Sequence, residues 1–420
     1  MYQQTTLANG LRIVCETIPH VHSVSLGIWV GTGSRYEEPQ YNGISHFIEH
    51  MLFKGTGRRT TKQIAEEMDA VGGQLNAFTT KEYTCFYAKL LDKHFRFGID
   101  LLSDMVTNSL FLPEELEKEK QVVIEEIKSY EDSPDELIHD IFAGAVLKGH
   151  PLGWTILGTP ETIRGIDREV ILQYLSHHYT PDNIVFAVAG NVQFDQIVAE
   201  VAQRFEGLAG HATKQLPSLP RLEQDVVIRS KETEQVHICL GTRGVERSSP
   251  EKFTVFVLDS ILGGSVSSRL FQELREERGL VYMAGSNHSA YQDTGLFSIY
   301  AGTSMENFEE VISLVKSELR KLRDNPVGAA ELARAKEQLK GNLLLSLEST
   351  CNRMSRIAKL VLFQEPLTTP EESVARIDQV DAAQVLEAAR AIFDENKLVI
   401  TAVGPFAEDS ELLRKGYHEY

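Results

Sequence analysis

Two stretches of this chain recur at almost the same distance further along, and this duplication limits the folds open to it. Residues 236–247 echo residues 24–35 at an offset of 212, and residues 395–404 echo residues 182–190 at an offset near 214. Each match is weak alone, but the shared spacing indicates a duplicated unit of about 210 residues. Strand-like alternation joined by short turns, with long helical stretches between, predicts the α+β class. We therefore expect two domains, each a mostly antiparallel sheet with helices packed on one face.

The length and the linker composition predict where these domains divide. A chain of 420 residues is too long for one ordinary core and suits two domains. A stretch rich in glycine and proline, ending at Pro220, separates the two copies. The prediction is an N-terminal domain over 1–208, a linker over 209–220 and a C-terminal domain over 221–420.

The main chemical signal is the segment His46-Phe47-Ile48-Glu49-His50. We predict a short helix with Ser45 as its N-cap and Gly55 as its stop. His46 and His50, four residues apart, then share one face and can reach one metal ion, with Glu49 close enough to hold the metal's water. This is the H-x-x-E-H order, the reverse of the H-E-x-x-H zinc motif. The competing interpretation, an ordinary charged surface helix, is disfavoured by apolar neighbours on almost every side: Phe47, Ile48, Met51, Leu52 and Phe53.

A third protein ligand is expected from the predicted helix 113–130. Glu119 and Glu126 are seven residues apart, so both lie on one face of this helix, with Val122 and Val123 between them. A carboxylate among apolar residues is costly unless it is paired or bound to metal. The spacing alone leaves both glutamates open as the ligand. Without the histidine motif, a solvated acidic helix face would be the simpler interpretation.

Charge and cysteine usage exclude several other classes. Lys and Arg number 42 against 60 Asp and Glu, a net charge of −18, which argues against a nucleic-acid partner. The four cysteines are scattered without a C-x-x-C pair and are expected to be small buried residues, neither disulfides nor ligands. No apolar run approaches the ~20 residues that span a membrane, and no leader pattern opens the chain. We expect a cytoplasmic protein, or a mature form that has already been processed.

The histidine motif, followed by Glu126 at 76 residues after His50, resembles the H-x-x-E-H-x75-E pattern of the M16 metallopeptidase family. This family includes pitrilysin, insulin-degrading enzyme and mitochondrial processing peptidase. The resemblance covers the whole chain and is closest to the short-subunit, processing-peptidase-like branch (M16B). It implies that family's metallohydrolase fold and one Zn²⁺ per chain, bound by His46, His50 and Glu126. It further implies that Glu49 is the general base that activates zinc-bound water, and that Glu119 supports the ligands from outside the coordination shell.

The same resemblance implies a substrate site. Residues 72–80 resemble the family's edge strand, on which an extended peptide adds as a further strand, so Asn76, Ala77 and Phe78 would bind substrate. Arg275 and Tyr282 match an Arg/Tyr pair that helps bind substrate from across a chamber. In the single-chain members this pair lies in the half opposite the zinc. We therefore expect a homodimeric clamp in which Arg275 and Tyr282 of the partner subunit complete each zinc site.

Together these features predict a zinc-dependent endopeptidase that hydrolyses unfolded peptides inside a clamshell chamber. The second copy has no H-x-x-E-H, and residues 255–264 stand in its place, so only one half would carry chemistry. The first alternative is a catalytically inactive scaffold or assembly subunit of the same fold, although such proteins typically lose the zinc residues that this chain keeps. The second is a metal-binding protein without proteolysis, which would leave Glu49 without a role.

Overall fold

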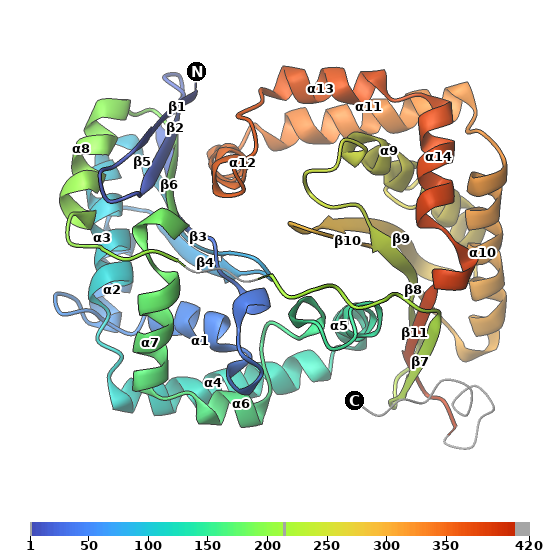
Figure 1. Cartoon of the computed structure of the whole chain (residues 1–420), viewed down its shortest axis with the longest axis horizontal. Coiled ribbons are helices and arrows are strands. Elements are labelled where there is room, and N and C mark those ends of the chain that lie inside the picture. Colours follow the sequence, from blue (N-terminus) through green and yellow to red (C-terminus); the bar gives the residue numbers. More distant parts are fainter. Residues whose placement is uncertain (1, 213–215, 408–420) are drawn as a thin grey trace. The chain divides into compact units, whose positions relative to one another are not determined.

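Two β-sheets organise the chain, one built from each half (Figure 1). The computed structural model describes residues 2–212 and 216–407. The first sheet has the order β1-β2-β6-β3-β5-β4, with strands β1 (Tyr2–Thr6), β2 (Arg12–Thr17), β3 (Ser23–Val30), β4 (Gln74–Thr79), β5 (Thr84–Leu91) and β6 (Ile184–Gly190). The second has the order β7-β11-β8-β10-β9, with strands β7 (Asp225–Ser230), β8 (Val236–Gly244), β9 (Val281–Ala290), β10 (Gly295–Thr303) and β11 (Val399–Gly404).

The two sheets repeat one topology. In the first, β2 runs parallel to β6 and the other pairs are antiparallel; in the second, β7 runs parallel to β11 and the other pairs are antiparallel. Strand β1 is the one addition to the first sheet within the described residues. The predicted duplication and the mostly antiparallel α+β class are confirmed.

Most helices of each half pack on one face of their own sheet. The first core joins β2, β3, β5 and β6 to α1 (Ile44–Met51), α2 (Thr61–Ala70), α3 (Phe95–Asn108), α4 (Pro113–Glu131), α6 (Pro160–Gly165), α7 (Arg168–His178) and α8 (Phe194–Phe205). The second joins its sheet to α9 (Lys252–Leu262), α10 (Phe308–Asp324), α11 (Ala329–Ser346), α13 (Pro370–Gln379) and α14 (Ala382–Ile392). Apolar side chains at helical spacing supply these buried faces.

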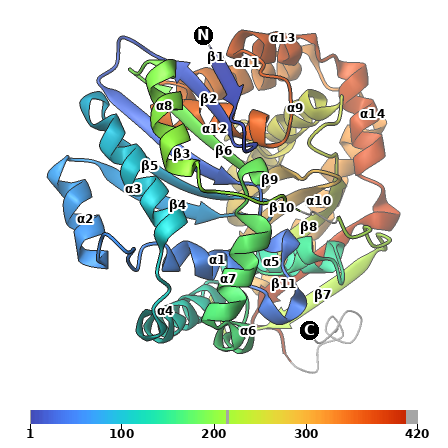
Figure 2. The same ribbon diagram turned by 60° about the vertical axis from the view of Figure 1, so that its left-hand side comes forward.

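The opposite face of each sheet is covered by a helix from the other half of the sequence. Helix α12 (Thr350–Leu362) packs on β2, β3 and β6 (Figure 2). Met354 Sδ, on this helix, accepts a 3.1 Å hydrogen bond from Trp29 Nε1. Helix α5 (Pro134–Val146) packs on β8 and β11. The two helices hold equivalent places in the duplicated copies: α5 follows the long helix α4, and α12 follows the long helix α11. This second layer was not predicted from the sequence.

Because of this exchange, the compact units do not coincide with one cut of the chain. Of the described residues, the first unit takes in those up to Lys128 together with those of Trp154–Pro217 and Ser346–Leu367, and the others form the second. The division predicted at 209–220 stays a prediction, and it does not anticipate the two exchanged helices.

Other sequence expectations have clear outcomes. The four cysteines are free thiols, three of them buried and Cys351 partly so. Within the described residues, no helix is both long and apolar enough to cross a membrane. The predicted metal-bearing helix is found as α1, but it ends at Met51. Gly55, the predicted stop, lies four residues later with a left-handed φ of +112°.

Candidate metal centre

Helix α1 begins in a way that the sequence did not predict. Gly43 is its N-cap and has a φ of +97°, and a Cβ at this position would lie 2.6 Å from the carbonyl oxygen of Leu157. The prediction of Ser45 as N-cap is wrong, because its hydroxyl lies inside the helix and hydrogen-bonds Tyr174 Oη at 2.8 Å. The cap comes instead from Glu37, whose carboxylate accepts the backbone N–H groups of Gly43 at 2.8 Å and Ser45 at 2.9 Å.

Three side chains from α1 and α4 meet at one point. Glu126 Oε1 lies 3.7 Å from His46 Nε2, and Glu126 Oε2 lies 3.5 Å from His50 Nε2. One ligand atom from each residue lies within 4.8 Å of the other two. These separations are long for hydrogen bonds but close to those of two ligands on one zinc ion, because bonds of about 2.0–2.2 Å at tetrahedral angles place their outer atoms about 3.3–3.6 Å apart. The donor set of two imidazoles and a carboxylate therefore fits Zn²⁺.

His46 is prepared to bind metal as a neutral imidazole. Its ring is buried, and this burial, with a smaller contribution from the neighbouring His50, lowers its pKa to about 3. Nε2 faces Glu126, whereas the buried Nδ1 has no hydrogen-bond partner within the described residues. A neutral ring with its Nε2 directed at the other two ligands is the form that coordinates zinc.

His50 is oriented from behind by Glu119. The Nδ1 atom of His50 lies 2.8 Å from Glu119 Oε1, and Lys54 Nζ lies 2.6 Å from Glu119 Oε2. Burial raises the pKa of Glu119, but the hydrogen bonds from His50 and Lys54 outweigh this and leave the pKa below its usual value. An ionised Glu119 accepts Nδ1–H, which leaves the Nε2 lone pair of His50 for a metal. The two glutamates that spacing left open thus both face His50, but on opposite ring nitrogens.

Glu49 sits beside this group without joining it. The hydroxyl of Thr79, at the end of β4, donates a 2.5 Å hydrogen bond to Glu49 Oε2. Burial raises the pKa of Glu49, and the Thr79 hydrogen bond opposes that rise only in part. A partly buried carboxylate with a raised pKa is better matched to proton transfer near neutral pH than an exposed one.

Comparison with known proteins places the chain in a family. A family model described as insulinase (peptidase family M16) matches residues 12–160, and one described as peptidase M16 inactive domain matches residues 165–339. A Bacillus subtilis (strain 168) protein named uncharacterized zinc protease YmxG is 44% identical over 396 residues, which cover 94% of this chain and 97% of that protein. The chain belongs to peptidase family M16.

Further relatives agree with this M16 assignment. A Streptomyces coelicolor protein, also named an uncharacterized zinc protease, is 38% identical over 415 residues, covering 97% of this chain and 90% of that protein. Two solved structures share the fold. A protease from Helicobacter pylori has a TM-score of 0.89 at 22% identity and covers 96% of this chain and 99% of its own. A peptidase M16 inactive domain from Pseudomonas fluorescens has a TM-score of 0.91 at 21% identity, covering 97% and 99%.

The strand predicted to bind peptide in this M16 chain lies at a sheet edge. Among the described strands, β4 pairs only with β5, so its other side is open. Asn76 is exposed, and its Oδ1 accepts the N–H of Ala77 at 2.8 Å. Ala77 packs against the core that contains α1. The Phe78 ring lies on the other face of the sheet, with its centroid 5.7 Å from that of the Trp29 ring. Of the three predicted contacts, Phe78 therefore lies on the face away from the core that includes the metal helix.

Arg275 and Tyr282 are brought together within the second unit. The Arg275 guanidinium carbon lies 5.1 Å from the centroid of the Tyr282 ring and 4.8 Å from that of Phe271. Tyr282, on the edge strand β9, is 76% exposed. The pair thus presents a cation and a phenol on an open surface.

Sequence reasoning missed Glu37, Lys54 and Thr79. Lys54 carries one usable signal, since it follows His50 by four residues and extends the same line of side chains beyond the end of α1. Glu37 and Thr79 come from a loop and a strand, where no helical periodicity points toward the metal helix. Only the tertiary fold brings them to it.

Proposed function

We propose that this M16 chain, of the processing-peptidase-like branch, is a zinc-dependent endopeptidase that hydrolyses peptide bonds of unfolded peptides. One observation carries the proposal: His46, His50 and Glu126 converge at zinc-ligand separations, with the spare carboxylate Glu49 on the same helix as the two histidines. An inactive scaffold has no need of that fourth group. The same reasoning disfavours a purely metal-storing protein.

Glu49, Thr79 and Glu119 have different roles in the proposed hydrolysis. Bound zinc would lower the pKa of a water molecule and polarise the scissile carbonyl. Glu49 takes the proton from the attacking water and delivers it to the departing amine nitrogen, so that one carboxylate serves as base and then as acid. Thr79 orients that carboxylate through its hydroxyl. Glu119 keeps the tautomer of His50 fixed throughout.

The substrate is proposed to bind as an extended strand along the open edge of β4, next to Asn76 and Ala77. Backbone hydrogen bonds would supply affinity with little dependence on side chains, which suits a peptidase for varied unfolded peptides. Arg275 and Tyr282 are proposed to contact the same substrate from the partner subunit of a homodimer. The proposal for Phe78 is limited to shaping the strand, because its ring packs near Trp29.

Glu49→Gln tests the reaction. The variant should keep its zinc content, because Glu49 is not a proposed ligand, and should lose cleavage of an unfolded peptide by a factor of about 10²–10⁴. Glu125→Gln, an exposed neighbour of Glu126, is the matched control and should cleave normally. Cleavage by Glu49→Gln at the wild-type rate would refute the mechanism. A zinc-loaded wild type that cleaves no unfolded peptide would favour the scaffold alternative.

Mixing two inactive variants tests the composite site. If Arg275 acts on the partner's zinc site, Glu49→Gln and Arg275→Ala should each be inactive alone. Their mixture should regain about a quarter of wild-type activity, because half of the dimers are mixed and each mixed dimer has one intact site. No recovery after subunit exchange, or a fully active monomer in sedimentation, would remove the homodimer from the proposal.

A further inference from the structure

The first turn of the metal-bearing helix depends on a residue outside it. A helix start leaves four N–H groups without intrahelical partners, and a side chain at the N-cap normally accepts one of them. In α1 the N-cap is Gly43, which has no side chain, and the closeness of Leu157 leaves no room for one. Glu37 takes over this function from six residues upstream of Gly43.

Glu37 is held by several donors at once. Its carboxylate is buried, with one oxygen accepting Gly43 N–H and Asn42 Nδ2–H, both at 2.8 Å, and the other accepting Ser45 N–H at 2.9 Å. Within the described residues Glu37 makes no ion pair with a lysine or arginine. A buried carboxylate compensated only by neutral N–H groups, two of them at a helix N-terminus, tolerates little displacement of that helix.

The segment that carries Glu37 is itself anchored next to the strand that holds the proposed base. Arg35, two residues earlier, forms a fully buried 2.8 Å ion pair with Glu82, and its N–H donates to the carbonyl of Lys81 at 2.8 Å. Glu82 and Lys81 lie in the turn that follows Thr79, the residue bonded to Glu49. One short segment therefore connects the start of α1 to the strand that orients Glu49.

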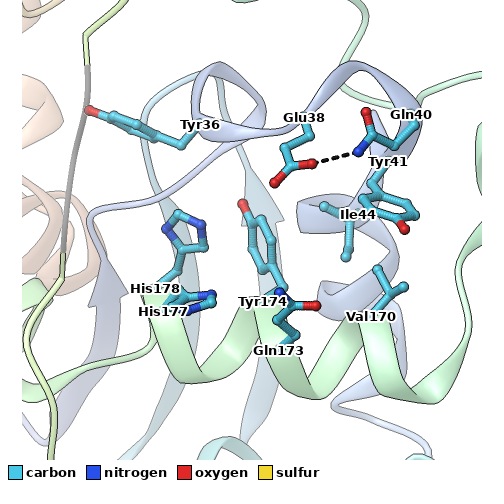
Figure 3. Close-up of a pocket in the computed structure, with 10 residues that line it drawn as sticks. All are labelled: Tyr36, Glu38, Gln40, Tyr41, Ile44, Val170, Gln173, Tyr174, His177 and His178. Carbon is cyan, nitrogen blue, oxygen red and sulfur yellow. Dashed lines mark hydrogen bonds between the residues drawn. The ribbon is translucent and has the colours of Figure 1, made fainter.

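The residues on either side of Glu37 face elsewhere. Tyr36 and Glu38 line a pocket of about 280 Å³ between this segment and α7, in which Glu38 accepts a 2.6 Å hydrogen bond from the Gln40 amide (Figure 3). Glu38 is exposed. The two adjacent glutamates thus differ: Glu37 is buried and accepts N–H groups at the start of α1, whereas Glu38 is exposed and bonded to Gln40.

We propose that Glu37 is a positioning residue for the metal centre, which fixes the first turn of α1 and thereby sets the affinity of His46 and His50 for zinc. The inference rests on the proposed zinc site, but it does not require that the site be catalytic. His46 is the third residue of α1 and His50 lies one turn later, so a loosened first turn changes the spacing of the two imidazoles directly.

Zinc affinity of the folded full-length protein is the decisive measurement. Metal-free wild type, Glu37→Gln and Glu37→Asp would be titrated with zinc against a chromophoric chelator, well below each melting temperature. Glu37→Gln should raise the zinc Kd by about tenfold or more, because its amide nitrogen faces N–H donors. Glu37→Asp keeps the charge but is one methylene shorter, and it should give an intermediate Kd. Glu38→Gln, the matched control, should keep the wild-type Kd.

Binding of Co²⁺ adds a spectroscopic signature. At saturating Co²⁺, the visible absorption of Glu37→Gln should differ from that of wild type and Glu38→Gln, because the ligand geometry has changed. If the Glu37 variants melt at lower temperature but keep the wild-type Kd and cobalt spectrum, Glu37 is merely structural and the inference is wrong. If Glu37→Gln does not fold, the Kd of Glu37→Asp decides alone.

These outcomes separate the inference from the proposed function. Wild type that binds zinc but cleaves no peptide leaves the role of Glu37 standing and refutes the peptidase. Unchanged zinc affinity in the Glu37 variants of an active enzyme refutes only the inference. Wild type that binds no zinc refutes both.

Discussion

Carboxylates around the candidate metal centre differ in their surroundings, and these surroundings separate their proposed roles. The Glu119 side chain is only 5% exposed and lies between a histidine and a lysine, so it stays ionised as an acceptor. The Glu126 side chain is 43% exposed and faces both histidine Nε2 atoms. Glu49 accepts a hydrogen bond from the neutral hydroxyl of Thr79. Burial still keeps the pKa of Glu49 above its usual value. Their partners therefore distinguish the three roles proposed for groups of identical chemistry: Glu119 as an orienting group, Glu126 as a ligand and Glu49 as a base.

Glu119→Gln should weaken zinc binding without removing a ligand. The amide is a weaker acceptor for His50 Nδ1–H and leaves Lys54 without its 2.6 Å ion-pair partner. Loss of such an outer contact typically lowers metal affinity by about 10–100-fold. Chelator competition measures the effect, and Glu125→Gln, an exposed residue paired with Lys128 at 2.6 Å, is the control. Equal zinc affinity in both variants would contradict the role given to Glu119.

Asp259, on α9 in the second copy, predicts a pH effect on stability. Burial raises its pKa from 3.8 to about 6, although the Ser286 hydroxyl donates to it at 2.6 Å. A raised folded-state pKa contributes stability that is present below the unfolded value and is lost as pH rises through about 6. Asp259→Asn cannot ionise and therefore does not show this loss. Its free energy of unfolding relative to wild type should rise by about 2 kcal/mol between pH 4 and pH 8, because one pKa unit corresponds to about 1.4 kcal/mol.

Urea unfolding at pH 4, 6 and 8 measures this difference. Asp324→Asn, an exposed acid at the end of α10, is the control and should show no such trend. If the difference in free energy of unfolding between wild type and Asp259→Asn does not change with pH, the folded protein does not penalise ionisation of Asp259 and the prediction is wrong.

At this scale the sequence could predict the residues that share a periodic element. His46, His50 and Glu49 follow from one helical turn, and the pair Glu119 and Glu126 follows from two turns of α4. Spacing could not say which of these two glutamates faces Nε2, because that depends on how α4 packs against α1. Glu37 and Thr79 could not be predicted as partners of α1. Glu37 lies in an irregular segment and Thr79 at the end of β4, so helical spacing connects neither residue to α1.

Among the elements, the β4–β5 hairpin is fixed by a buried ion pair. Arg35 and Glu82 are 0% and 1% exposed at the side chain and lie 2.8 Å apart. Removing one partner of a buried pair leaves a charge that cannot be hydrated, whereas replacing both by apolar residues is often tolerated. The turn that this pair holds follows directly after Thr79, so its position matters to the proposed base.

Arg35→Met should therefore destabilise the protein more than the double change Arg35→Met with Glu82→Leu. We expect the single variant to lose about 3–5 kcal/mol and the double variant to recover much of that loss. Denaturant unfolding of wild type, both single variants and the double variant gives the coupling free energy. Additive effects of the two single changes would show that the ion pair contributes little.

Element identities were predicted better than element boundaries. The helix predicted at 113–130 appears as α4, because its periodicity is local. The start of α1 was misjudged at Ser45, because the approach of Leu157 to Gly43 is a tertiary contact. The second helical layer on each sheet was missed for the same reason.

In the whole molecule, the exchanged helices make each half depend on the other. The first sheet buries Trp29, Val14 and Val185 against α12, which lies more than 150 residues beyond its last strand. Without that helix these side chains would face water, and burial of a large apolar side chain contributes about 1.5–3 kcal/mol. The stability of the half that carries the candidate metal centre thus depends on residues 346–367.

A fragment of residues 1–208 should consequently fail to fold as an independent domain. We expect it to lack a cooperative thermal transition and to bind a hydrophobic dye. Co-expression with residues 209–420, which supply α12, should restore solubility and zinc binding. A fragment 1–208 that melts cooperatively on its own would show that α12 is dispensable.

The exchange of α5 and α12 also bears on how such a chain could have arisen. A single ancestral copy would have carried one such helix and one apolar sheet face for that helix to cover. Two identical chains could satisfy both faces by trading that helix, as in a domain-swapped dimer. Gene fusion would then have turned the exchange into a contact within one polypeptide, in which only one copy needs the histidine motif although both helices remain necessary.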